Sequence, residues 1–341
     1  MEHNGEEYLI LQDNMALQGS GSISFSQIES EFGSNGTRSL GSYRLTQNVG
    51  SLTNLPLDSG VPTSGTIKFS DFYSKRLNVV VDCFSGGDET RTIAKNDKWN
   101  NNQLTVIGGF RSQKEGGSKI IINVNKKICS DKSAVTNCAL KTGSWDSTAL
   151  VQVDVGSSGR ILGSGGDGGR GANGIDSSGQ AGFTGTSGLG IDHNGVTVNV
   201  QSGGIIRAGF GGGGGGGGDR QVDKGQDRRA SGGGGGGGAG CPPGAGGPRG
   251  TTGSLGSNGS AGTETTGGGG GSRGVNENQA YGGAGGSGGQ AQGGAGAGNN
   301  AENSGGPGGG SGAAIRRNSG FSVTINNSGT IQGSTTATGV G

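Results

Sequence analysis

Residues 211–238 read GGGGGGGGDRQVDKGQDRRASGGGGGGG, so that two uninterrupted glycine runs, Gly211–Gly218 and Gly232–Gly238, flank a charged segment. Beyond them glycine recurs at every third position, most regularly from Gly244 to Gly262. A period of three belongs neither to an α-helix nor to a β-strand. It is the period of an extended left-handed helix that rises about 3.1 Å per residue and has no internal hydrogen bonds.

Such helices leave every backbone N–H and C=O group without a partner, and ordering glycine carries a large entropic cost. Because glycine has no side chain, extended helices packed side by side can hydrogen-bond laterally in several directions. The glycine runs therefore leave two alternatives, a disordered segment or a bundle of polyglycine II helices. The strand patterns on both sides of this region favour the bundle.

The composition limits the partners of the chain. It has 341 residues, 86 of them glycine and only six proline, and a formal net charge of +1. The low net charge predicts no nucleic acid partner, and so few prolines argue against a collagen triple helix. No apolar stretch approaches about 18 residues, so we expect no membrane insertion. The polar start at Met1–Glu7 predicts no signal peptide.

A sequence repeat occupies the N-terminal part. Residues 20–28 read SGSISFSQI and residues 64–72 read SGTIKFSDF. Each copy predicts a short strand followed by a short helix. In the first copy, Ser26 and Glu29 are expected to form the capping box and Gly33 to stop the helix.

About 80 residues with so few apolar positions make a marginal core. We therefore interpret this part as docking modules that complete their core against another protein or against further copies of the chain. A homotrimer would complete the cores around a threefold axis, and an ordinary small α+β domain is the alternative. The predicted docking residues are Ile23, Phe25, Ile28, Phe32, Ile67, Phe69, Phe72 and Tyr73.

The middle of the chain alternates apolar and polar residues and is rich in Val and Ile, which predicts strands. The predicted strands cover residues 77–83, 103–110, 120–124 and 149–155. A second repeat, a strand followed by a Ser/Asn/Gly turn and a short apolar strand, recurs at 151–161, 196–206 and 323–331. These copies predict stacked β rungs, from which glycine-rich excursions leave at 163–195 and 208–320 and return.

The predicted fold class is mainly β with little α-helix. Four parts are expected: docking modules (1–76), a β-rich domain (77–162), a polyglycine II domain (163–320) that contains the β rung at 196–206, and a C-terminal β segment (321–341).

No catalytic constellation, phosphate-binding loop or paired carboxylates occur, so we predict neither an enzyme nor a cofactor. Residues 168–176 nearly match a calcium-binding nonapeptide, but one copy cannot build a stacked roll. His193 is expected in an exposed loop. The four cysteines form no C-x-x-C pair, which argues against zinc; free thiols are the favoured state, and a bridge between Cys129 and Cys138 is the alternative.

Polar segments interrupt the glycine at 219–229, 263–266, 272–281 and 299–304. Loops on a rigid scaffold are the usual place for binding, although the same charges can serve solubility alone. The candidate binding residues are Arg220, Lys224, Asp227, Arg228, Arg229, Arg273 and Tyr281.

The repeats at 20–28 and 64–72 resemble segments of structural proteins of tailed bacteriophages, especially marine and cyanobacterial ones. The glycine runs with polar interruptions are similar to the distal tail-fibre adhesins of T-even-like phages. That resemblance implies a sandwich of polyglycine II helices built from the runs at 211–218, 232–238 and 267–271. It implies receptor-binding loops at 219–230 and 272–281.

The resemblance further implies a component of the phage tail, attached to the fibre or the baseplate, with other virion proteins and a host cell-surface receptor as partners. Because no signal peptide is predicted, we expect assembly in the host cytoplasm. The alternatives are a structural spacer without receptor binding and, outside phage biology, an ice-binding or matrix protein.

Overall fold

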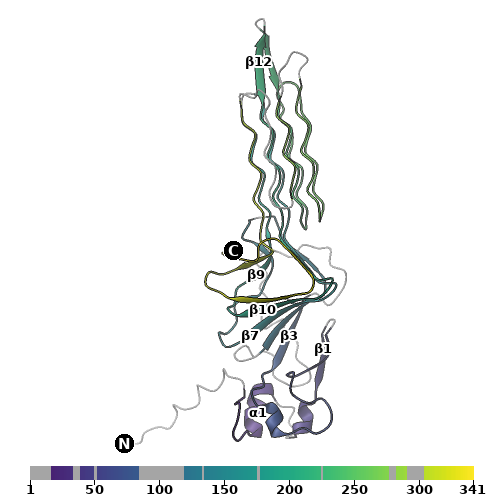
Figure 1. Ribbon diagram of the computed structural model, residues 1–341, viewed down its shortest axis with the longest axis vertical. Helices are drawn as coiled ribbons and strands as arrows, with labels where there is room; N and C mark the ends of the chain where they lie inside the picture. Colours follow the sequence, from purple (N-terminus) through teal and green to yellow (C-terminus); the bar gives the residue numbers. More distant parts are fainter. Residues whose placement is uncertain are drawn as a thin grey trace, which may run out of the picture.

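The computed structural model arranges the chain as a rod with a helical module at one end, a β-sheet body in the middle and long extended segments that end in a hairpin (Figure 1). It describes residues 17–33, 39–49, 52–83, 119–132, 134–174, 177–223, 226–275, 282–289 and 303–341.

The N-terminal module contains helix α1 (Phe25–Phe32), two 3₁₀ turns, η1 (Leu40–Tyr43) and η2 (Phe69–Phe72), and the antiparallel pair β1 (Thr46–Val49) and β2 (Leu52–Pro56). The capping box lies two residues before the predicted one. Ser24 Oγ accepts from Gln27 N at 3.3 Å and Gln27 Oε1 accepts from Ser24 N at 2.8 Å, so the prediction of Ser26 and Glu29 was wrong. The stop at Gly33 is confirmed, with a φ of 82°.

An aromatic cluster forms the core of this module. The rings of Phe32, Tyr43 and Phe72 meet edge to face at centroid distances of 5.6 to 6.2 Å. Ile28 and Leu57 are fully buried beside them. One chain thus supplies a closed core for the module.

The body is a coil of parallel strands with three sheets, which we call the β prism. The first sheet contains β3 (Asn78–Cys83), β4 (Lys119–Val124), β7 (Leu150–Val155), β10 (Val196–Val200) and β15 (Val323–Asn327). The second contains β5 (Lys127–Cys129), β8 (Arg160–Leu162), β11 (Ile205–Arg207) and β16 (Thr330–Gln332). The third contains β6 (Cys138–Lys141), β9 (Ser187–Ile191), β14 (Ile315–Arg317) and β17 (Ala337–Thr338).

The predicted stacking of the three repeats is confirmed. Val198 lies opposite Val153 on one side and Ile325 on the other, and all the pairs are parallel. Val153 and Val198 are fully buried because alternate residues of each strand point into the prism. The predicted strand at 103–110 lies outside the described residues.

Both glycine-rich excursions leave the prism at the same corner. One connects β8 to β9 and the other connects β11 to β14. The chain re-enters the prism at Ser187 and Ile315, before the predicted ends of the excursions at 195 and 320. Strand β9 was not predicted because the glycines at 188 and 190 interrupt the apolar alternation that indicates a strand. The four-part division of the chain remains a proposal.

The excursions form an ordered lattice of extended segments, drawn side by side in Figure 1. The described segments run through 163–173, 177–186, 208–218, 231–239, 244–252, 256–262, 267–274, 282–289 and 303–313. Adjacent segments hydrogen-bond once every three residues. Gly166 N donates to Phe210 O at 2.9 Å, and Gly169 N donates to Gly213 O at 2.8 Å.

The number of glycines in each triplet increases with the number of sides on which other segments pack against that segment. Segment 231–239 bonds to six other segments, and all its glycines are buried. In run 211–218, a Cβ on Gly212, Gly213 or Gly214 would lie 1.8 to 2.1 Å from a carbonyl oxygen of a different neighbour. The outer segment 177–186 keeps glycine at one position in three and exposes Phe183 on its outer side.

We predict that Gly214→Ala lowers the free energy of unfolding by about 3 kcal/mol or more, because the added methyl meets the oxygen of Gly306 at 1.8 Å. Gly269→Ala is the matched control, since a Cβ there meets nothing within 4 Å. It should stay within about 1 kcal/mol of the parent chain. Chemical denaturation measures both, and equal losses in the two variants would contradict the lattice.

Candidate functional site

The lattice ends in a hairpin at the pole opposite the N-terminal module (Figure 1). The segment between the glycine runs forms β12 (Asp219–Asp223) and β13 (Gln226–Ala230), which pair antiparallel. In this register Arg220 lies opposite Arg229. Asp219 is buried at the foot of the hairpin, and its carboxylate accepts from Arg220 N at 2.8 Å.

Two neighbouring turns pack beside the hairpin. Arg229 O accepts from Ser254 N at 2.9 Å. Asn173 Oδ1 accepts from Thr251 N at 2.8 Å and from the guanidinium of Arg170 at 3.2 Å. The oxygen that a calcium-binding nonapeptide would offer to a cation is therefore bound to N–H groups. Hereafter "the tip" means the hairpin 219–230 with these turns at 170–174 and 251–255.

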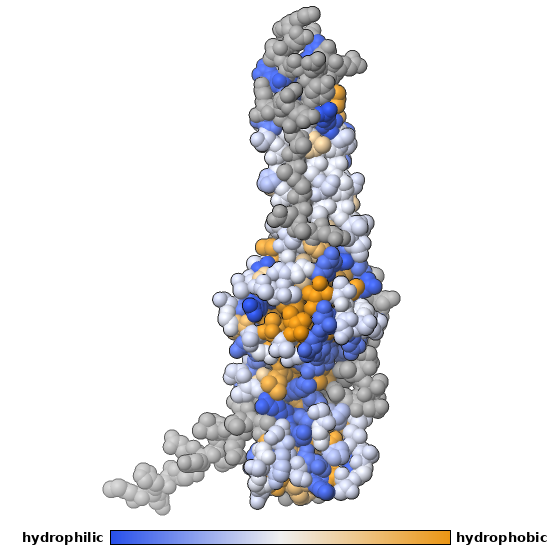
Figure 2. Space-filling view, viewed as in Figure 1, coloured by the Kyte–Doolittle hydropathy of each residue, from blue (hydrophilic) through white to orange (hydrophobic). Residues whose placement is uncertain are grey.

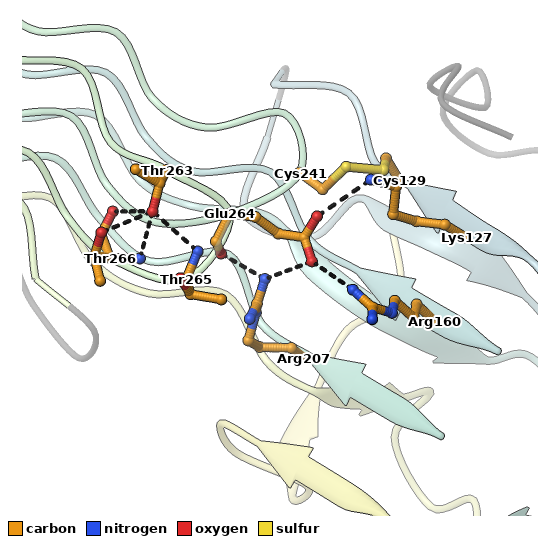
Figure 3. A network of polar contacts seen from close by, with 9 residues as sticks. All are labelled: Lys127, Cys129, Arg160, Arg207, Cys241, Thr263, Glu264, Thr265 and Thr266. Atoms are coloured by element: carbon orange, nitrogen blue, oxygen red, sulfur yellow. Dashed lines mark hydrogen bonds and ion pairs between the residues drawn. A yellow bond between two sulfur atoms is a disulfide. The ribbon is translucent and has the colours of Figure 1, made fainter. Parts of the chain in front are cut away.

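The opposite end of the lattice, its base, is bonded to the second sheet of the prism (Figure 3). A disulfide joins Cys129 in β5 to Cys241, which lies in a basal turn of the lattice. The prediction of free thiols was wrong for Cys129 and Cys241 and is confirmed for Cys83 and Cys138, and the alternative of a Cys129–Cys138 bridge was also wrong. Cys138 begins β6 in a different sheet, and proximity in sequence did not reveal this separation.

A second basal turn inserts Glu264 between three cations of the second sheet (Figure 3). Its carboxylate lies 3.2 Å from Lys127 Nζ, 3.2 Å from Arg160 Nη1 and 3.8 Å from Arg207 Nη2. The side chain of Arg207 is only 6% exposed. Burial lowers the pKa of its guanidinium, and Arg160 acts in the same direction, whereas Glu264 opposes them.

The family model described as Phage tail fibre adhesin Gp38 matches residues 88–336. The chain belongs to this family. The match spans the prism from β4 to β16 and the whole lattice, while the N-terminal module precedes it and β17 follows it. No curated protein and no solved structure matches the chain. The likeness to the T-even-like distal tail-fibre adhesins is thereby confirmed.

Membership makes the chain a non-enzymatic component of the phage tail fibre, with the host receptor and tail-fibre proteins as partners. None of the described helices is long and apolar enough to cross a membrane. Within the described residues, no cluster of three His, Cys, Asp or Glu side chains is placed to hold a metal ion.

The adhesin brings some of the predicted binding residues together at the tip. Arg220, Arg228 and Arg229 lie in the hairpin and are half-buried. Asp227 belongs to β13, but its side chain lies outside the described part, as do Lys224 and Tyr281. Arg273 is half-buried in the segment that ends at Val275.

Two apolar side chains near the hairpin were missed by sequence reasoning. Leu255 is 46% exposed and Val275 is 54% exposed. Their neighbours Ser254 and Gly274 bond to the hairpin end of segment 231–239. Figure 2 shows hydrophobic and hydrophilic residues side by side at this end. The sequence signal that could have identified Leu255 and Val275 is that each is a single large apolar residue within a glycine-rich stretch.

The histidine prediction was also wrong. His193 is 7% exposed, and its Nε2 lies 3.1 Å from Ala149 O. It lies in the turn before β10 and contacts the residue directly before β7. The ring therefore serves the prism and takes no part in the tip.

We predict that Glu264→Ala lowers the free energy of unfolding by about 3 kcal/mol, because it leaves the buried Arg207 cation without its carboxylate. Lys132→Ala is the control, since Lys132 and Asp167 form an exposed ion pair of 2.8 Å. Its loss should stay below about 1 kcal/mol. Denaturation of both variants at equal salt measures the difference, and a neutral Glu264→Ala would show that the cluster does not stabilise the base.

Proposed function

We propose that the adhesin binds its host receptor with the tip and with the segment 272–281. The supporting observation is how the backbone and side chains are distributed. In the inner segments of the lattice, backbone carbonyls and N–H groups are hydrogen-bonded on all sides. The turns at the end of the lattice, in contrast, carry side chains. The proposed receptor-binding residues are Arg220, Lys224, Asp227, Arg228, Arg229, Arg273 and Tyr281.

The side chains around the hairpin suit this role chemically. Guanidinium groups of Arg228 and Arg229 offer hydrogen-bond donors in a planar fork, and Leu255 and Val275 offer apolar contact beside them. Recognition surfaces combine such anchors with a polar rim. The lattice sides contribute chiefly glycine and small residues, which provide little that is specific.

The competing function is a spacer that binds nothing. Replacing residues 219–230 by a short Gly/Ser turn should reduce adsorption of phage particles to host cells at least tenfold and leave particle assembly unchanged. The double variant Arg228→Ala, Arg229→Ala should lower adsorption in the same direction. Arg317→Ala, in β14 of the prism, is the control for loss of an arginine elsewhere. Unchanged adsorption with intact particles would favour the spacer.

We further propose that the N-terminal module docks the adhesin on the fibre or baseplate. Ile28, Phe32 and Phe72 are fully buried and support this surface from beneath. Phe25 and Phe69 pack edge to face at 4.9 Å, and Phe69 is 36% exposed. The remaining proposed docking residues, all half-buried, are Ile23, Ile67 and Tyr73.

Phe25→Ala with Phe69→Ala should reduce the amount of adhesin that co-purifies with phage particles severalfold. Phe183→Ala is the control, because Phe183 is a 64% exposed phenylalanine on the lattice. If the double variant docks normally, another surface holds the fibre. The last rung of the prism, where Val323 and Ile325 are half-buried, is the next surface to mutate.

The homotrimer stays a prediction. Phe32, Tyr43 and Phe72 close the core of the module within one chain, so that core does not require a threefold axis. The mass of the purified adhesin in solution tests the trimer, and a monomeric mass would contradict it.

A further inference from the structure

The junction between lattice and prism joins two parts that are far apart in the chain. Cys129 and Cys241 are separated by 112 residues, and their Cα atoms lie 5.2 Å apart. Cys129 belongs to the prism and is fully buried. Cys241 lies in the basal turn of the lattice and is partly exposed. Nothing in the family description or in the receptor-binding proposal assigns a role to this bond.

Backbone hydrogen bonds position both cysteines without the disulfide. Cys241 N donates to Gly163 O at 2.8 Å, and Gly165 N donates to Pro242 O at 2.9 Å. On the prism side, Ser130 N donates to Leu162 O at 3.0 Å and Cys129 pairs with Leu162. The contacts of Glu264 bind the next basal turn to the same sheet. Each cysteine is therefore held in place by hydrogen bonds of its own backbone or its immediate neighbour, in addition to the covalent bond.

The other two cysteines do not compete for this bond. Cys83 and Cys138 are buried thiols in the first and third sheets. Burial raises the pKa of Cys138 to about 12. A thiol of that kind forms almost no thiolate near neutral pH and exchanges slowly. Cys241 is the member of the set that an oxidant in solution can reach.

We propose that the Cys129–Cys241 disulfide is a redox lock that closes after folding. A tail-fibre protein is made in a cytoplasm that keeps thiols reduced, and it acts outside the cell. The two thiols lose two protons and two electrons to form one S–S bond. A low-molecular-weight disulfide accepts the electrons and leaves as two thiols. The closed bond then holds the basal turn of the lattice on the prism.

Full-length adhesin purified in dithiothreitol should be folded by circular dichroism and should contain four titratable thiols after denaturation. Incubation with oxidised glutathione followed by its removal should lower the count to two and raise Tm by about 5 to 10 °C. Dithiothreitol should reverse both changes. Cys138→Ser is the control and should keep the response to glutathione, whereas Cys129→Ser with Cys241→Ser should lose it.

The comparison within the wild-type chain decides the outcome even if the double variant does not fold. A reduced chain that is unfolded would make the bond a condition of folding and overturn the lock. Equal Tm values for the reduced and oxidised chains would overturn it as well. Loss of the response in Cys138→Ser would assign the bond to other cysteines. Receptor binding enters none of these measurements.

Discussion

Lateral hydrogen bonding between extended glycine segments is the constraint on which the lattice depends. A polyglycine II helix has no internal hydrogen bonds, so each N–H must find a carbonyl on a neighbour. The neighbour can approach only if the facing residue lacks a Cβ. This requirement explains why Gly211–Gly218 is uninterrupted in the interior, whereas segment 177–186 needs glycine only at 179, 182 and 185.

The lattice has almost no hydrophobic core, and the prism supplies the apolar burial that it lacks. Val153, Val198 and Ile206 are fully buried between rungs, and parallel pairing keeps them in layers. Because both excursions leave from one corner, the prism holds their ends close together. The disulfide and the Glu264 cluster add specific bonds at that corner. The prism thus limits the entropy that the glycine segments must lose.

The close packing of the lattice limits where the sequence of such an adhesin can vary. A side chain added inside the lattice meets a backbone oxygen at about 2 Å, and backbone cannot move aside cheaply. At the tip the same restriction falls on single glycines, such as Gly253, where a Cβ would lie 2.1 Å from Arg229 O. Under the proposed function, recognition chemistry lies in Asp219–Ala230 and structural chemistry lies in the glycine runs on either side of it.

The sequence alone determined the local periods. A period of three predicted the extended segments, and alternation predicted the rungs at 151–161, 196–206 and 323–331, because these patterns reflect which positions face a neighbour. The sequence also indicated some of the arginines at the tip, because they interrupt the glycine runs.

Only the tertiary structure decided which segments meet. The Cys129–Cys241 bond, the contact of Glu264 with Arg207 and the burial of His193 join residues from separate rungs and turns. Their spacing in the sequence carries no trace of these contacts, because long glycine excursions separate the partners along the chain. Strand β9 was missed for a related reason, since its glycines are required by neighbouring atoms and not by its own conformation: carbonyl oxygens pack against Gly188, and the side chains of Cys138 and Val340 pack against Gly190.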